Sequence, residues 1–292
     1  MVNLPQARVT SARPFINAGV DYFGKLWIHY NIKGKKPTKA YVALFCGFAT
    51  KAVHFEVVSD LSTEAFKGAL KRFISRGGRC QNIYGENATN FVGARNKLSE
   101  LSSSIFSENE KQLVTSTFSS KGIQFHFIRP RAPHFGGLWE TAAKSAKHLL
   151  IRSVGSASLT YEALEPVIIE IEAILSSRPL TPMSNDPSDI SALSPGHLLI
   201  DEAPTAQVDT EASSKKLSLL SRWELVSQVK YEFWKRWSNE YLRELQQSHK
   251  WKKRSSNTKP GNMVIIREDN ILIMKWPLGR ATNVYPGNDG SV

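Results

Sequence analysis

The chain of 292 residues is 41% hydrophobic and 22% charged, so it can bury a sizeable core and is not disordered throughout. Its 38 Lys and Arg against 26 Asp and Glu give a formal net charge of +12, which indicates nucleic acid as the partner ahead of an anionic membrane surface. Two cysteines are too few for a disulfide framework or a zinc site, and no apolar run is long enough to span a membrane. We therefore expect an intracellular protein of about two domains.

Short β-rich runs open the predicted fold. Val, Phe, Tyr and Ile dominate four runs, separated by turn residues, at 15–22, 26–30, 40–48 and 52–58. This spacing fits three antiparallel strands. Ser62 or Thr63 can cap a following helix, whose apolar residues recur every three or four positions until Gly77 and Gly78, and a fourth strand is expected at 81–84.

Helices and strands then alternate. The patterns predict, in order, helices at 91–102 and 108–120, a strand at 123–128, and helices from 138 to about 151 and from 160 to 176. The loop at 129–137 contains two prolines and a glycine pair, so it cannot be helical. Three strands in a row followed by this alternation predict an α/β fold with a mixed sheet flanked by helices.

The C-terminal third differs in composition. Small polar residues at 201–220 are typical of a linker, and an apolar repeat predicts a helix over 222–250. Three short β-like runs at 263–267, 271–275 and 279–285 suggest a small, incomplete barrel. The predicted organisation is a lead-in tail at 1–12, a core domain at 13–200, a linker at 201–220, a basic Trp-rich helix at 221–254 and a partial β module at 255–292.

Three acidic residues lie at the edges of these elements. Asp21 is on the first strand, Glu86 just follows the fourth strand, and Glu140 is in the first turn of the helix after the Pro-rich loop. If the two strands are neighbours and the helix packs against their ends, the three carboxylates converge. Carboxylate oxygens select Mg²⁺ or Mn²⁺, and two such ions can drive phosphodiester transfer. The spacing alone equally fits ordinary helix-cap or surface acids.

Longer sequence motifs in the same region help to decide between a metal site and ordinary surface acids. They read RPF from 13, GVDY at 19–22, ATKAVH at 49–54, SDLSTEAF at 59–66, NATNFVG at 87–93, PRAPHFGGLWE at 130–140, SRPLTP at 177–182 and LSPGHL at 193–198. Together they resemble the integrase core of Pao/BEL-type LTR retrotransposon polyproteins, over about 13–200. The strings KWPLGR at 275–280 and YPGNDG at 285–290 look like the C-terminal SH3-like β-barrel module of that family.

The resemblance implies an α/β, RNase H-like fold followed by a long helix and a small incomplete SH3-like barrel. It implies a D,D,E triad, Asp21, Glu86 and Glu140, that is both catalytic and metal-ligating, with two Mg²⁺ or Mn²⁺ ions in an active protein and no zinc. The implied activity is DNA integration: trimming the ends of element DNA and joining them to target DNA. The implied partners are DNA and further copies of the chain on DNA ends, with no membrane, in the nucleus or else the cytoplasm.

The turn at the second acid departs from the pattern. The family usually has Ser-Asp-Asn-Gly there, whereas this chain has Gly85, Glu86, Asn87 and Ala88. Glutamate moves the carboxylate outward by about 1.5 Å, and a misplacement on the order of 1 Å can cost about a hundredfold in rate. Alanine also disfavours the positive φ that glycine permits. We expect catalysis to be weakened, in a piece of a polyprotein with no N-terminal zinc module before Arg13 and a barrel cut short.

Basic residues are the predicted DNA contacts. Lys144, Lys147 and His148 share one helical face with Glu140, and the resemblance implies that they grip DNA, although a solvated face with one ion pair is the simpler interpretation. His134 could contact phosphate or hydrogen-bond its own loop. The remaining candidates are Arg129 and Arg131 in that loop, and Lys250, Lys252, Lys253 and Arg254 at the end of the basic Trp-rich helix.

Three hypotheses follow from the sequence. The first is an integrase core that performs strand transfer at the three acids. The second is a catalytically silent DNA-binding protein of the same fold, whose binding weakens with salt and is indifferent to the acids. The third, which the resemblance disfavours, is a nuclease of the same fold.

Overall fold

The computed structural model describes residues 10–30, 32–85, 122–127, 137–154, 159–206, 221–246 and 257–287. Side chains at 137–145, together with those of Phe127 and Gln246, lie outside this description. The helices predicted at 91–102 and 108–120, most of the loop at 129–137 and the linker beyond residue 206 also lie outside it.

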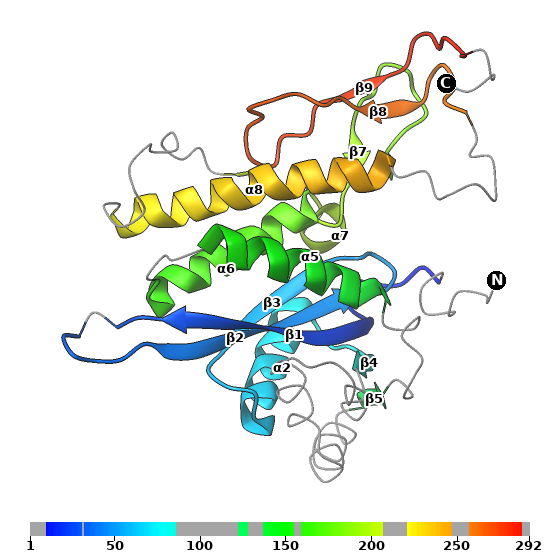
Figure 1. The fold of residues 1–292 in the computed structure, drawn as a ribbon. Coiled ribbons are helices and arrows are strands. Elements are labelled where there is room, and N and C mark those ends of the chain that lie inside the picture. The colour runs from blue at the N-terminus through cyan, green and yellow to red at the C-terminus, as the bar shows by residue number, and fades with distance from the viewer. Residues whose placement is uncertain are drawn as a thin grey trace.

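A five-stranded mixed sheet forms the centre of the fold (Figure 1). Its order is β3-β2-β1-β4-β5; β1 pairs antiparallel with β2 and β2 with β3, whereas β4 runs parallel to both β1 and β5. The strands are β1 (Asn17–Ile28), β2 (Thr38–Gly47), β3 (Val53–Val58), β4 (Asn82–Gly85) and β5 (Gln124–Phe127). The predicted α/β class, a mixed sheet flanked by helices, is confirmed, as are the three antiparallel strands.

Strand β1 joins two runs that the sequence separates at Gly24. The pairing with β2 continues through this glycine, with a shift of register between Phe23 and Leu26. Gly24 has a φ of 139°, and a Cβ atom there would lie 3.0 Å from the carbonyl oxygen of Ala40. Only glycine fits this bulge without strain, so the residue that breaks the β pattern is the one that lets the strand continue.

Helices cover both faces of the sheet. Helix α2 (Thr63–Gly77) packs on one face, and its first turn is capped by Ser62, whose Oγ accepts a hydrogen bond from the backbone N–H of Ala65 at 3.2 Å. Helices α5 (Gly137–Val154) and α6 (Tyr161–Ser176) cover the other face (Figure 1). Because both faces are covered, β2 is buried from Ala40 to Gly47.

Alternate residues of the sheet enter two separate hydrophobic clusters. The α2-side cluster contains Phe15, Ala18, Val20, Tyr41, Ala43, Phe45, Phe66, Ala69, Leu70 and Phe73, among others. The α5-side cluster contains Phe23, Leu26, Ile28, Ala40, Val42 and Leu44 with buried residues of the helices on that face. Along β2 the two sets alternate strictly, as the two-residue repeat of a strand requires.

Helix α8 (Arg222–Gln246) packs on α5 and α6 and contributes to the α5-side cluster. Its apolar positions Val226, Val229, Phe233 and Trp237 are buried in the α5-side cluster, and the helix contacts both α5 and α6. The helical repeat predicted from residue 222 is confirmed as far as residue 246. Trp237 stacks on Tyr241 with ring centroids 5.6 Å apart.

The C-terminal segment contains small strands but not the predicted middle one. Strands β8 (Met263–Ile265) and β9 (Leu278–Arg280) pair antiparallel. The prediction of a strand at 271–275 is wrong: a turn closes there, with the backbone N–H of Lys275 donating to the carbonyl oxygen of Leu272. Ile271, Ile273 and Met274 instead pack against the α5-side cluster, which explains their apolar character.

Shorter elements connect α6 to α8. Strands β6 (Thr181–Pro182) and β7 (Ala192–Leu193) pair antiparallel, and α7 (His197–Ile200) follows. Among the described residues, no helix combines the length and the apolar character needed to cross a membrane.

Candidate active site

Asp21 lies on the sheet face that α5 covers. Ala18 and Val20 belong to the α2-side cluster and Phe23 to the α5-side cluster, and the register of β1 is regular over this stretch. Since side chains alternate along a strand, Asp21 shares the face of Phe23. The carboxylate is half-buried, and its Oδ1 accepts a hydrogen bond from the backbone N–H of Tyr22 at 2.7 Å.

Strand β4, which ends one residue before Glu86, lies next to β1. The two strands are parallel, with Ala18 opposite Ile83 and Val20 opposite Gly85. The last paired residues therefore immediately precede Asp21 on one strand and Glu86 on the other. The predicted neighbourhood of the first and fourth strands is confirmed, while Glu86 itself lies outside the described residues.

Helix α5 contributes the third acid's backbone. It begins at Gly137, which puts Glu140 in its first turn, and it packs against β1 and β2. The side chain of Glu140 lies outside the description. No group of three or more His, Cys, Asp or Glu able to hold a metal occurs among the described residues, a set that contains only one of the three predicted ligand side chains. The convergence of the three carboxylates stays a prediction.

Two of the predicted DNA contacts can be seen on α5. His148 is exposed and Lys147 half-buried, whereas Ala146, Leu149 and Leu150 are buried in the α5-side cluster. Lys147 and His148 therefore lie on the side of the helix away from these buried residues, as the helical repeat predicts. The side chain of Lys144 lies outside the description. Entirely outside the described residues are Arg129, Arg131, His134, Lys250, Lys252, Lys253 and Arg254.

A buried network of charged side chains lies at edge strand β3, and the sequence analysis did not predict it. We call it the His54 network. His54 of β3 is 8% exposed and lies between two carboxylates, with Nε2 3.0 Å from Glu56 and Nδ1 3.1 Å from Glu172 of α6. Glu56, 4% exposed, also accepts from Arg72 Nε at 2.5 Å and Arg76 Nη1 at 2.8 Å, both on α2. The network ties β3 to a helix on each face.

Two members of the network, His54 and Glu56, remain charged at neutral pH. Burial lowers the pKa of His54, but hydrogen bonds to Glu172 and Glu56 and the charges of these carboxylates outweigh burial and raise that pKa to about 9. Burial raises the pKa of Glu56, and hydrogen bonds from His54 and Arg72, with their charges, lower it below its ordinary value. The alternating His and Glu in an otherwise apolar strand are the sequence signal that could have revealed the network.

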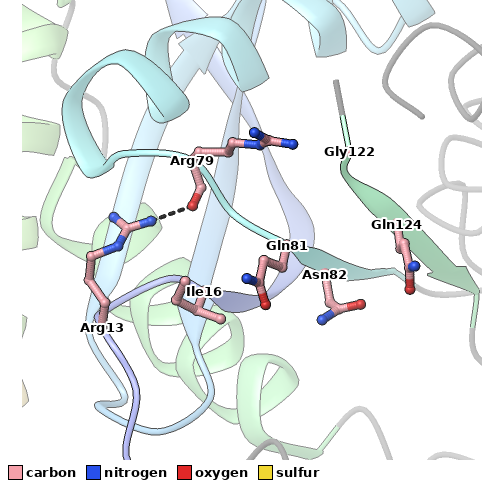
Figure 2. A pocket seen from close by; sticks show the side chains of 7 residues that line it. All are labelled: Arg13, Ile16, Arg79, Gln81, Asn82, Gly122 and Gln124. Carbon is pink, nitrogen blue, oxygen red and sulfur yellow. Dashed lines mark hydrogen bonds between the residues drawn. The ribbon is translucent and has the colours of Figure 1, made fainter. Parts of the chain in front are cut away.

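A pocket of about 530 Å³ lies at the beginning of β4 and β5 (Figure 2). It is lined by Arg13, Ile16, Arg79, Gln81, Asn82, Gly122 and Gln124. Arg13 donates to the backbone carbonyls of Gly77 and Arg79, so it holds the end of α2. Because Asn82 and Gly85 are the two ends of β4, this pocket is at the end of the sheet opposite to the acids.

A family described as "Family of unknown function (DUF5641)" matches residues 221–292. No curated protein matches. A chain of the simian T-cell lymphotropic virus intasome, in complex with PP2A regulatory subunit B56 gamma, is 16% identical with a TM-score of 0.43, covering 75% of this chain and 70% of that one.

A second solved structure is the HTLV-2 integrase catalytic core domain in complex with magnesium, in its dimeric form. It is 17% identical with a TM-score of 0.38, covering 64% of this chain and 97% of that one. Both similarities are too low to transfer any residue's role to this chain.

Proposed function

We propose that this protein is an integrase of the Pao/BEL type that joins DNA by phosphodiester strand transfer, with Asp21, Glu86 and Glu140 as its acids. One observation supports this most: parallel strands β1 and β4 stay in register up to Val20 and Gly85, one residue before the first two acids. Helix α5, with Glu140 in its first turn, packs against β1. This arrangement supports the proposal that the three acids converge.

The donor set fits a hard divalent cation. Carboxylate oxygens are the ligands that Mg²⁺ and Mn²⁺ prefer, and Asp21, Glu86 and Glu140 would hold one or two such ions. Bound ions would polarise the phosphodiester and support the attacking and leaving oxygens. The chain itself fixes the Asp21 carboxylate through the N–H of Tyr22 and offers Lys147 and His148 to substrate phosphates.

Glutamate at position 86 makes the proposed enzyme slow. Its carboxylate reaches further from β4 than an aspartate would, by about one C–C bond or 1.5 Å. Asp21, on the neighbouring strand, is held in place by a hydrogen bond of its own and is constrained against adjusting to the longer side chain. We therefore expect Glu86→Asp to raise strand transfer about a hundredfold, the scale of a 1 Å correction.

The deciding experiment is a strand-transfer assay with end-matched oligonucleotides in Mg²⁺ and in Mn²⁺. Product should appear with the wild-type chain, increase with Glu86→Asp and disappear with Glu140→Gln. Glu268→Gln is the matched control, because Glu268 is an exposed acid in the C-terminal segment. If Glu86→Asp brings no gain and Glu140→Gln behaves like the control, the catalytic proposal is wrong.

A second candidate, a DNA-binding protein without catalysis, is favoured by the net charge of +12 and by the altered second acid. It would bind DNA as an oligomer in the nucleus, with Lys250, Lys252, Lys253 and Arg254 among its contacts. Binding would weaken with salt and with loss of these four residues, and would not respond to Asp21→Asn or Glu140→Gln.

A further inference from the structure

The connection between β1 and β2 forms a second basic surface, distant from the acids. We call residues 27–39 the basic hairpin. It projects past the helices that cover the sheet (Figure 1). Its four lysines, Lys33, Lys35, Lys36 and Lys39, are all exposed.

The charge of this hairpin is not balanced locally. The sequence contains six lysines and no Asp or Glu from Tyr22 to Phe55. None of the four hairpin lysines lies within ion-pair distance of a carboxylate in the part of the chain that the structure describes. Uncompensated ammonium groups on a projecting ribbon attract a polyanion.

Exposed aromatic rings accompany these lysines. Trp27 is 53% exposed and lies directly opposite Lys39 in the β1–β2 pairing, with the Lys39 Nζ 5.8 Å from the ring centroid. The Nζ of Lys35 lies 3.6 Å from the centroid of Tyr30, which is 38% exposed. The cation–π contacts hold ammonium groups beside aromatic faces that are open to solvent.

Trp27 has no role in the core that would explain it. Its neighbours Leu26 and Ile28 are buried in the α5-side cluster, while Trp27 points to the other face at a position that remains in water. Exposed aromatic rings interleaved with positive charge are typical of surfaces that track a nucleic-acid backbone, where the lysines contact phosphates and the rings contact sugars or bases.

We propose that the basic hairpin is a docking surface for the sugar-phosphate backbone of DNA. The proposal rests on the proposed function in taking DNA as the polyanion, but it concerns binding and not catalysis. Trp27 is six residues beyond Asp21 along β1, about 20 Å at ~3.3 Å per residue. Substitutions in the hairpin therefore leave the acids in place, and the two proposals can be tested separately.

The test compares two triple variants of the full chain with equal loss of charge. Lys33→Gln, Lys35→Gln and Lys36→Gln change the hairpin, and Lys51→Gln, Lys71→Gln and Lys259→Gln change exposed lysines elsewhere. Binding to a fluorescein-labelled 30-base-pair duplex is measured by fluorescence polarisation over a series of salt concentrations. The hairpin variant should bind at least about tenfold more weakly, and the slope of log K against log salt should fall by about 2 to 3.

Each outcome decides the proposal. If both variants lose the same affinity and slope, only net charge matters and the hairpin is not a specific surface. If the hairpin variant keeps its DNA affinity but loses binding to phosphatidylserine vesicles, the partner is a membrane and the proposal is wrong. Loss of DNA binding by the hairpin variant alone supports it, even if Glu140→Gln leaves strand transfer unchanged and the catalytic proposal fails.

Discussion

The His54 network predicts a specific dependence of stability on pH. His54 is protonated between the carboxylates of Glu172 and Glu56, so Glu172→Gln should remove one of the two groups that hold its proton. The folded-state pKa of about 9 is above the ordinary value of 6.5. A raised pKa stabilises the fold fully below pH 6.5, and this stabilisation is lost as the pH rises through about 9.

The size of the effect follows from the pKa difference. At about 1.4 kcal/mol per pKa unit, the difference between 6.5 and about 9 corresponds to about 3 kcal/mol of folding free energy at pH 6. Glu172 supplies one of the two charged hydrogen bonds, so its loss should cost about 2 kcal/mol at pH 6. At pH 10 His54 is neutral in both proteins, so only the smaller cost of weakening the hydrogen bond that the backbone N–H of Phe55 donates to Glu172 at 2.7 Å should remain. Arg72 and Arg76 face Glu56 from α2.

Urea unfolding of the wild type and of Glu172→Gln, at pH 6 and pH 10, measures this difference. Glu165→Gln is the control, because Glu165 is a half-buried acid on the same helix outside the network, and its change should stay within about 0.5 kcal/mol at both pH values. A destabilisation by Glu172→Gln that is the same at pH 6 and pH 10 would refute the reasoning, since it would show that the charge of His54 is not involved.

Three further predictions concern the packing. Gly24→Ala should destabilise the fold by about 2 kcal/mol in urea, because its φ of 139° is unfavourable for alanine and the new Cβ would press on the carbonyl of Ala40 at 3.0 Å. Lys230→Met should cost about 3 kcal/mol, because Lys230 is 2% exposed and its Nζ lies 3.1 Å from Glu170; adding Glu170→Gln should recover part of that loss. Trp237→Ala should cost about 3 to 5 kcal/mol and lower the melting temperature of the whole fold in one transition, because α8 shares the α5-side cluster; a separate early transition of α8 would contradict this.

Local sequence patterns were sufficient for most helices and strands. The apolar repeats of α2, α6 and α8 and the β-rich runs of β2 and β3 depend on neighbours a few residues away, so they can be recognised without knowledge of the fold. The same reasoning failed at 271–275, where apolar residues pack against a distant cluster instead of pairing as a strand. Apolar character indicates burial but does not say which surface buries it.

The sequence by itself determined the class of the fold, the identity of the three candidate acids and a basic chain suited to a polyanion. Tertiary structure alone decided that β1 runs unbroken through Gly24, that β4 lies beside β1 in a register ending at Val20 and Gly85, and that His54 joins carboxylates from β3 and α6. These contacts join residues up to 118 positions apart in the chain. Their net free energy is the balance of packing and charge pairing against the cost of removing charges from water, which no local pattern of residues records.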